Sequence, residues 1–205
     1  MITLHHLNQS RSKRIIWLLE ELDVPYQVEA YNRDSVTFLA PPELKSIHPL
    51  GKSPVIEDND LVITESGAIT EYLIQTYGNG KFAPEQGTKA HTEYLQWLHF
   101  AESSAMLPLL LKMFVSKDGA QTNFLADYAD AEIKKVISYF DSSLEGKTYL
   151  VDEKLTGADI MMSFVVEVVA KFGLIEHYPN IQRYGEQLKT HQAFNRAEQI
   201  EVKYG

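Results

Sequence analysis

The chain contains no cysteine among its 205 residues. This absence excludes a disulfide scaffold, a zinc site built on thiolates, a CxxC redox pair and a cysteine nucleophile. Any thiol chemistry must therefore use a thiol that another molecule supplies. The hydrophobic share of 44% and the charged share of 23% are ordinary for a globular protein, and the length allows one large domain or two small ones.

Basic charge is also scarce, since 19 Lys and Arg stand against 28 Asp and Glu and the formal net charge is -9 at pH 7. Nucleic acid and anionic membranes need a basic patch that neutralises phosphates, so neither is expected as a partner. We also find no apolar run long enough to span a bilayer and no basic-then-apolar leader. We therefore expect a cytoplasmic protein.

The first part of the chain alternates between strand and helix signals. Two β-rich runs flank an amphipathic helix, which predicts a βαβ unit with a parallel pairing. After a proline-containing connection, two short β-rich runs separated by Asp58, Asn59 and Asp60 predict a hairpin, and a helix follows. This order predicts a four-stranded mixed sheet. The expected elements cover residues 2–7, 11–23, 26–31, 43–47, 53–58, 61–66 and 66–77.

The second part of the chain has helix signals only. Gly78, Gly80, Pro84 and Gly87 punctuate a linker, after which apolar residues recur at spacings of three and four. Pro108 is expected to bend the first of these helices. We predict one domain over residues 1–80, a linker over 81–87 and an all-α domain over 88–205. The expected helices cover residues 88–115, 121–144, 157–172 and 179–189.

Residues 156–159, TGAD, have the Ser/Thr-x-x-Asp form of a capping box that opens an apolar helix. The simplest role for this motif is a structural one, the capping of that helix. On the capping interaction alone, we expect Asp159→Ala to lower stability by about 1 kcal/mol.

A polar turn precedes the first helix, where Asn8, Gln9, Ser10 and Ser12 gather. Free backbone N–H groups and the positive end of the helix dipole favour an anion at such a place. A single serine at a helix start is usually only a cap. The turn therefore predicts an anion site, suited to a thiolate or a carboxylate, without naming the ligand.

Two later motifs make the sequence more specific. GKSPVIED at residues 51–58 and ESGAI at residues 65–69 occur in this order after a βαβ opening and before an all-α remainder. Over almost the whole chain, this pattern resembles the cytosolic glutathione S-transferases. The resemblance implies an α+β fold in which an N-terminal thioredoxin-like βαβ-ββα domain precedes an all-α helical bundle.

The resemblance also implies a set of glutathione-binding residues. In the family, the residue before a cis proline pairs its backbone with the cysteinyl part of glutathione, and the second motif receives the γ-glutamyl carboxylate and ammonium. Many relatives have an aliphatic residue before that proline, but a backbone contact tolerates the change to serine. A lysine, assisted here by a histidine, receives the glycyl carboxylate. The positions implied in this chain are His48, Lys52, Ser53, Pro54, Glu65 and Ser66.

The family lowers the pKa of the glutathione thiol with a Tyr, Ser or Cys near the start of the first helix. This chain has no tyrosine in residues 1–24, so the resemblance to serine-type, theta-like members implies Ser10, while Ser12, Asn8 and Arg11 stay open. Lowering a thiol pKa of about 8.5 by about two units requires about 2.7 kcal/mol. A hydroxyl donor supplies about 1.5–3 kcal/mol and a helix start about 0.3–1 kcal/mol. We expect Ser10 to donate a hydrogen bond, because the sequence shows no His/Asp relay that activates it as a nucleophile.

The activity implied is a homodimeric detoxification enzyme that joins glutathione, as co-substrate, to a small apolar electrophile bound against residues 97–114. No metal or other cofactor is implied. Two alternatives remain. One is a glutathione-dependent peroxidase or reductase, and the other is a non-catalytic module of the same fold used for binding or assembly.

Overall fold

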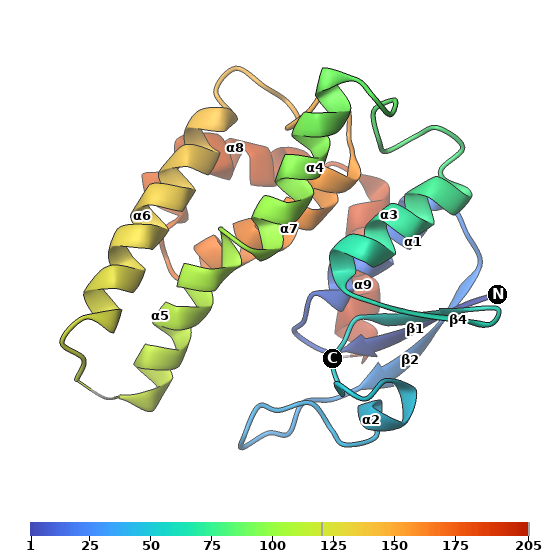
Figure 1. The fold of residues 1–205 in the computed structure, drawn as a ribbon, viewed down its shortest axis with the longest axis horizontal. Helices are drawn as coiled ribbons and strands as arrows, with labels where there is room; N and C mark the ends of the chain where they lie inside the picture. The colour runs from blue at the N-terminus through green and yellow to red at the C-terminus, as the bar shows by residue number, and fades with distance from the viewer. Residues whose placement is uncertain (120, 205) are drawn as a thin grey trace. The chain divides into compact units, whose positions relative to one another are not determined.

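The computed structural model describes residues 1–119 and 121–204. The chain forms two compact units. The first comprises Met1–Phe82 together with the C-terminal segment that begins at Lys189, and the second comprises Ala83–Leu188 (Figure 1). The predicted linker over residues 81–87 thus contains the point at which the chain passes from the first unit to the second.

The first unit is built on the predicted four-stranded mixed sheet, whose strand order is β2-β1-β3-β4. β1 pairs parallel with β2 and antiparallel with β3, and β3 pairs antiparallel with β4. β1 is buried along most of its length, because it is a central strand covered by helices. The strands are β1 (Ile2–Leu7), β2 (Tyr26–Tyr31), β3 (Val55–Asp58) and β4 (Leu61–Thr64).

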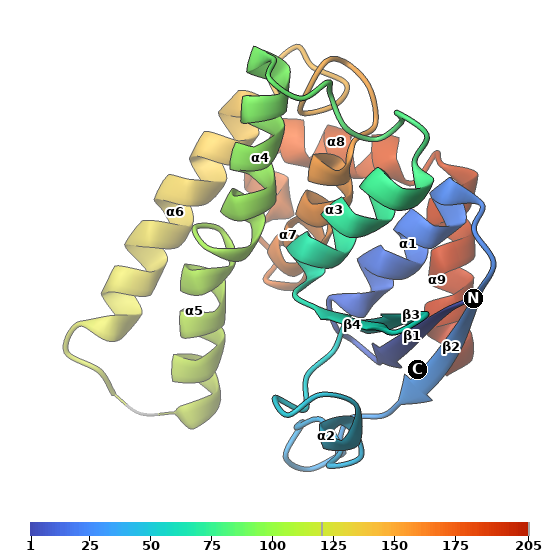
Figure 2. The same ribbon diagram turned by 45° about the vertical axis from the view of Figure 1, so that its right-hand side comes forward.

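The helices of the first unit make the fold thioredoxin-like. Figure 2 shows α1 and α3 over one face of the sheet and α2 on the other side of it. The apolar side of α1 supplies much of the core, since Ile15, Ile16 and Leu18 are fully buried. The helices of this unit are α1 (Ser12–Leu22), α2 (Leu44–Ile47), α3 (Ser66–Tyr77) and α9 (Gln192–Tyr204).

The buried carboxylate of Asp58 attaches α3 to the end of the β3–β4 hairpin. It accepts hydrogen bonds from the hydroxyl of Tyr72, at 2.9 Å, and from the hydroxyl of Tyr77. The hydrogen bond to Asp58 is the main reason that the pKa of Tyr77 is raised to about 12. This anchor fixes the position of α3, whose first turn carries part of the candidate site.

The last helix, α9, was not predicted, and residues 189–205 were assigned to the helical domain. In the structure α9 packs on α1 in the first unit. Phe194 meets Trp17 edge to face with ring centroids 5.1 Å apart, and the buried residues Ala193 and Ala197 lie on the same helix. Because small alanines form its buried side, α9 lacks the strong apolar stripe that marked the other helices.

The second unit is helical throughout its regular structure, as expected. The buried aromatic residues Trp97, Phe140 and Tyr184 contribute to its core. Its elements are α4 (Lys89–Glu102), α5 (Met106–Asp118), α6 (Leu125–Ser143), α7 (Gly157–Lys171), the short 3-10 helix η1 (Ile175–His177) and α8 (Pro179–Leu188).

The helix expected over residues 88–115 is divided into α4 and α5 at Ser103–Ala105, ahead of the bend predicted at Pro108. Proline lacks the N–H that would bond to the carbonyl four residues earlier, and its ring crowds that carbonyl, which here belongs to Ser104. The chain therefore breaks before the proline. Pro108 then lies in the first turn of α5, where helical N–H groups have no intrahelical acceptor in any case.

By length and composition alone, the segment Lys89–Asp118 is apolar enough to cross a membrane. The expectation that the chain has no such run is therefore not met for this segment. Helices in the core of a globular protein meet the same criterion, and this segment is interrupted between α4 and α5. The segment is therefore weak evidence for a membrane span.

The capping box at the start of α7 extends into a buried network. Asp159 accepts hydrogen bonds from the backbone N–H and the hydroxyl of Thr156, from the N–H of Leu150 at 3.0 Å and from the hydroxyl of Tyr184 at 2.8 Å. Burial raises the pKa of Asp159 in spite of these donors, which act in the opposite direction. One carboxylate thus joins the start of α7 to the preceding loop and to α8.

Because of this network, we expect Asp159→Ala to lower the free energy of unfolding by more than the loss of a cap alone. The substitution leaves several buried donors without an acceptor, so we expect a loss of about 3 kcal/mol in the free energy of unfolding. Asp127→Ala is the matched control, because Asp127 is an exposed acid in the first turn of α6. It should cost less than about 1 kcal/mol. Urea denaturation measures both, and equal losses would contradict the network.

Candidate functional site

The turn between β1 and α1 places the hydroxyl of Ser10 at the start of the helix. Gln9 adopts a left-handed backbone conformation, with φ of 51°, which reverses the chain. The N–H of Ser12 then donates to Ser10 Oγ at 3.2 Å. Ser10 is 6% exposed, whereas Ser12 is fully buried. Of the two serines, Ser10 is therefore the one with access to a ligand.

The hydroxyl of Ser12 is surrounded by protein groups. Its Oγ lies 2.7 Å from His6 Nδ1, 2.8 Å from Ser10 Oγ and 3.1 Å from the carbonyl oxygen of Leu7, to which it donates. Asn8, another candidate, has its Oδ1 occupied by the backbone N–H of Arg33 at 2.9 Å. These contacts favour Ser10 over Ser12 and Asn8 as the group that meets a ligand.

A histidine lies behind the two serines, although the sequence had shown no His/Asp relay. His6 is fully buried on β1, and burial lowers its pKa to about 4. Its Nε2 lies 3.3 Å from Oε2 of Glu201 on α9, within ion-pair range although poorly aligned for a hydrogen bond. The sequence signal that could have pointed to this histidine is the pair of adjacent histidines within an otherwise apolar strand.

The loop before β3 is joined to the same turn. The Ser53–Pro54 peptide bond is cis. Ser53 Oγ donates to the carbonyl oxygen of His5 at 2.8 Å and accepts from the N–H of Leu7 at 3.1 Å. The N–H of Leu7 also points to Ser12 Oγ, at 3.3 Å. The structure therefore brings Ser53 next to the start of α1, although the sequence separates them by more than forty positions.

The start of α3 is joined to α1 by a hydrogen bond. Ser66 is buried, and its Oγ accepts a hydrogen bond from Nη2 of Arg14 at 2.6 Å. Glu65 precedes the helix with a φ of 64°, is exposed, and makes no side-chain capping bond. The first turn of α3 thus offers backbone N–H groups together with an outward-facing carboxylate.

Lys52 and His48 lie on the connection between α2 and β3. Lys52 is exposed, and within residues 1–119 and 121–204 neither it nor Glu65 has a hydrogen bond or an ion pair with another side chain. His48 is half-buried, and its Nδ1 accepts from the N–H of Leu50 at 3.4 Å. In the described part of the chain, no hydrogen bond joins Lys52 or Glu65 to Ser10.

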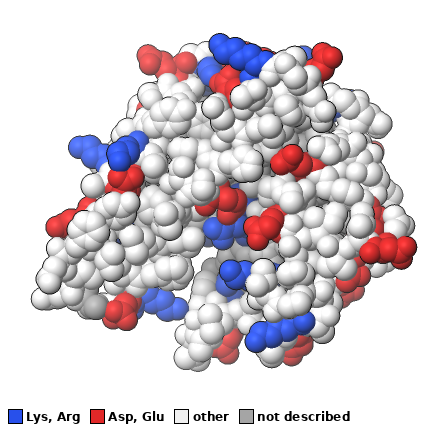
Figure 3. Space-filling view, in the orientation of Figure 1, with Lys and Arg blue, Asp and Glu red and all other residues white. Residues whose placement is uncertain are grey.

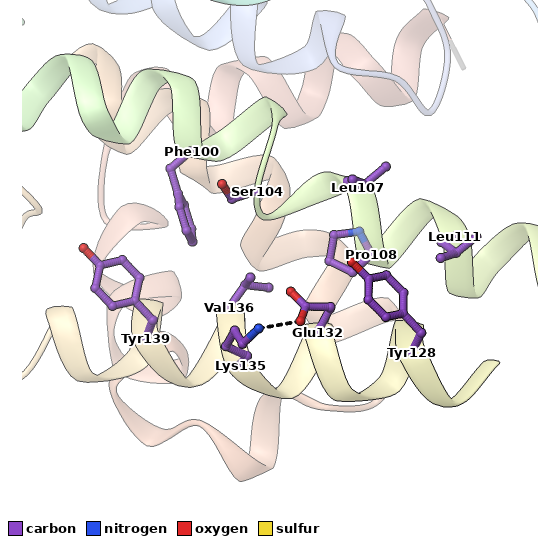
Figure 4. A pocket seen from close by; sticks show the side chains of 10 residues that line it. All are labelled: Phe100, Ser104, Leu107, Pro108, Leu111, Tyr128, Glu132, Lys135, Val136 and Tyr139. Atoms are coloured by element: carbon purple, nitrogen blue, oxygen red, sulfur yellow. Dashed lines mark hydrogen bonds and ion pairs between the residues drawn. The ribbon is translucent and has the colours of Figure 1, made fainter. Parts of the chain in front are cut away.

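The second unit contains an apolar cavity of about 550 Å³ between α4, α5 and α6 (Figure 4). Phe100, Leu107, Pro108, Val136 and Tyr139 are among its lining residues, and Glu132 pairs with Lys135 at its edge. Of the apolar residues expected along residues 97–114, some line this cavity and others, such as Met106, are buried in the core.

The surface carries no continuous basic region on the face drawn in Figure 3, where Lys and Arg are interspersed with Asp and Glu. Within the described residues, no group of three or more His, Cys, Asp and Glu side chains is arranged to hold a metal ion. On that face, positive charge for an anionic ligand is therefore available only locally.

The fold and the site define a thioredoxin-like domain, with its cis proline beside the start of the first helix, followed by a helical unit. The family model "Glutathione S-transferase, N-terminal domain" matches residues 1–75, and the C-terminal domain model of the same family matches residues 102–191. The chain belongs to the glutathione S-transferase family and is an enzyme of that family.

Known proteins show the same similarity along the whole chain. Glutathione S-transferase 1 of Saccharomyces cerevisiae is 31% identical, with 95% of this chain and 92% of that protein covered. A crystal structure of a glutathione S-transferase from Actinobacillus pleuropneumoniae is 41% identical with a TM-score of 0.91, covering 98% of this chain and 93% of that one. A glutathione transferase of Phanerochaete chrysosporium, solved in complex with oxidized glutathione, is 25% identical with a TM-score of 0.83, covering 100% and 97%.

Because His6 is buried, we expect the protein to lose stability in acid. Its folded-state pKa of about 4 lies below the ordinary value of 6.5, so the unfolded chain takes up a proton as the pH falls below 6.5 while the folded chain does not. Stability is therefore lost between pH 6.5 and pH 4, by about 2 kcal/mol at pH 5. Urea denaturation at pH 7.5 and pH 5 should show this loss in the wild type and a smaller one in His6→Gln. Equal losses in the wild type and in His6→Gln would contradict the conclusion that the buried His6 causes the loss of stability in acid.

Proposed function

We propose that this chain binds reduced glutathione in its first unit and transfers the thiolate to a small apolar electrophile. The observation that carries the proposal is the position of Ser10 Oγ, at the start of α1 and joined through Ser12 and Leu7 to the cis-proline loop. A glutathione bound along that loop would pair its peptide backbone with the backbone of the loop, just before β3. Its cysteinyl sulfur would then lie near the helix start.

Ser10 acts in this proposal as a hydrogen-bond donor to the sulfur. A thiol with a pKa of about 8.5 is only a few per cent ionised at pH 7. The charge-assisted bond from a hydroxyl contributes about 1.5–3 kcal/mol and the helix start about 0.3–1 kcal/mol. Together they lower the thiol pKa by about one to three units. The low exposure of Ser10 supports this role, because limited contact with water strengthens the interaction.

The two ends of glutathione are assigned to polar and charged groups of the first unit. The γ-glutamyl carboxylate would bind Ser66 and the start of α3, and its ammonium would bind Glu65. The glycyl carboxylate would bind Lys52, with His48 as a second donor. Ser53 and Pro54 would supply the backbone edge for the cysteinyl part. The bound oxidized glutathione of the Phanerochaete chrysosporium structure supports a ligand of this class.

The electrophile is proposed to be small and apolar, and the apolar cavity of the second unit has the volume and lining that such molecules need. We further propose a cytoplasmic homodimer acting in detoxification, with glutathione as co-substrate and no resident cofactor. The domain assignment that goes with this proposal is a glutathione-binding first unit and a helical second unit.

The first test is the ionisation of bound glutathione in Ser10→Ala. Removing the donor should raise the pKa of the bound thiol by about one unit or more, since a hydrogen bond to a charged group contributes about 1.5–3 kcal/mol. Thiolate absorbance across pH 5–9 measures it. Ser46→Ala is the matched control, because Ser46 is an exposed serine that donates to its own helix turn. Identical titrations in wild type and Ser10→Ala would remove Ser10 from the assignment.

A second test separates binding from ionisation. Lys52→Ala should weaken glutathione binding about tenfold or more and leave the pKa of the bound thiol unchanged, because the lysine meets the glycyl end. Lys81→Ala, another exposed lysine of the first unit, serves as the control and should bind normally. Calorimetric titration gives both affinities. An unaltered affinity in Lys52→Ala would place the glycyl end elsewhere.

The overall activity is tested by retention on immobilised glutathione, followed by rates with a haloaromatic electrophile and with an organic hydroperoxide. Retention with conjugation as the faster reaction supports the proposal. A faster peroxide reaction favours the peroxidase alternative. No retention and no rate would favour a non-catalytic module of this fold.

A further inference from the structure

Four side chains form a path behind the proposed thiolate position, joined in sequence by two hydrogen bonds and one ion-pair contact. Ser10 Oγ lies 2.8 Å from Ser12 Oγ, which lies 2.7 Å from His6 Nδ1, and His6 Nε2 lies 3.3 Å from Glu201 Oε2. These groups come from the β1–α1 turn, α1, β1 and α9. Three of them are buried below 7% exposure, and the Glu201 side chain is 16% exposed.

The path has a preferred direction before any ligand binds. A carboxylate beside Nε2 favours the tautomer that carries its proton there, which leaves Nδ1 as an acceptor. The single proton of the Ser12 hydroxyl then points to His6 Nδ1, at 2.7 Å, in place of the Leu7 carbonyl oxygen at 3.1 Å, and Ser10 donates to Ser12. The lone pairs of Ser10 Oγ consequently face outward, and Ser10 presents an acceptor to an arriving thiol S–H.

A thiolate needs the opposite arrangement, in which Ser10 donates to sulfur. One concerted shift produces it. The S–H bond breaks as Ser10 takes the proton, the former Ser10 proton passes to Ser12, and the former Ser12 proton passes to His6 Nδ1. The released proton is then held on His6, whose Nδ1 and Nε2 are both protonated, and the nearby Glu201 carboxylate balances the positive charge.

We propose that Ser12, His6 and Glu201 are positioning residues that form a proton relay behind Ser10 and turn its hydroxyl from an acceptor of the thiol into a donor to the thiolate. This inference rests on the proposed function, since it needs glutathione sulfur at Ser10. It extends that function by assigning three residues that do not touch the ligand.

The surroundings of His6 keep it neutral until the relay operates. Burial holds its pKa near 4 in the free protein, so it rests neutral at physiological pH and gains a proton only when a negative charge forms at the other end of the path. The charged group that faces it from α9 is Glu201, whose Oε1 is held by the N–H of Gln9 at 2.8 Å. From β2, its pairing partner is the uncharged Ala30.

Other charged groups lie nearby but outside the path. The Lys13–Glu198 ion pair joins α1 to α9 one turn before Glu201. His5 precedes His6 on β1, so its side chain points to the opposite face of the strand, where it contacts Tyr31 and Glu57. His5 and Glu198 provide matched controls. His5 shares β1 with His6, and Glu198 shares α9 with Glu201, but neither control residue belongs to the path.

The experiment measures the pKa of enzyme-bound glutathione in five variants. His6→Gln and Glu201→Gln should raise that pKa by about one unit, which lowers the thiolate fraction and kcat at pH 6.5 about fivefold to tenfold. The KM for glutathione should change less than about twofold, because neither residue touches the ligand. His5→Gln and Glu198→Gln should titrate as the wild type does, and Ser10→Ala should show the larger shift already proposed.

Each outcome decides a separate point. If Ser10→Ala shifts the thiol pKa while His6→Gln and Glu201→Gln do not, the relay is wrong and the proposed function stands. If Ser10→Ala has no effect, or if the wild type does not bind glutathione, the proposed function fails and the relay with it. Should His6→Gln fail to fold, Glu201→Gln still decides, since glutamine keeps the shape of the side chain and can accept from Gln9. Shifts as large in the two controls would also overturn the relay.

Discussion

The N–H of Leu7, at the end of β1, points to two serine hydroxyls, Ser12 Oγ at 3.3 Å and Ser53 Oγ at 3.1 Å. This shared donor joins the central strand, the start of α1 and the cis-proline loop at one point. The half-buried hydrogen bond from Ser53 Oγ to the His5 carbonyl and the buried one between Ser12 and His6 continue from it. Because a buried donor or acceptor without a partner costs about 1–3 kcal/mol, these groups hold one another in a single arrangement. The site depends on that arrangement.

Two further attachments keep the same region in place. Arg14 on α1 donates to Ser66 at the start of α3, and Asp58 holds the far end of α3 to the hairpin. The last helix covers α1 with Trp17 and Phe194 in contact and carries Glu201 toward His6. Since buried side chains in such a network have few alternative positions, the position of Ser10 Oγ is fixed before the ligand arrives.

The family is shown by the two domain models and by the relatives that cover nearly the whole chain. The family alone does not decide the electrophile or the way in which Ser10 is supported. In the proposed function, Ser10, Lys52 and Glu65 serve the reaction at glutathione, and the apolar cavity of the second unit receives the other substrate. The proposed relay depends on residues of four different elements, so it belongs to the folded chain and not to a motif.

The sequence by itself determined the strand and helix order of residues 1–77, because apolar periods of two and 3.6 residues and the turn residues there agree with one another. It also determined the capping box at Asp159 and the motifs around Pro54 and Ser66. It missed α9, whose buried side is made of alanines, and it placed the break near Pro108 several residues too late. Only the tertiary structure brought His6, Ser12 and Glu201 together behind Ser10. Their sequence separation of up to 195 positions leaves no local pattern, and packing of α9 on α1 is what closes that distance.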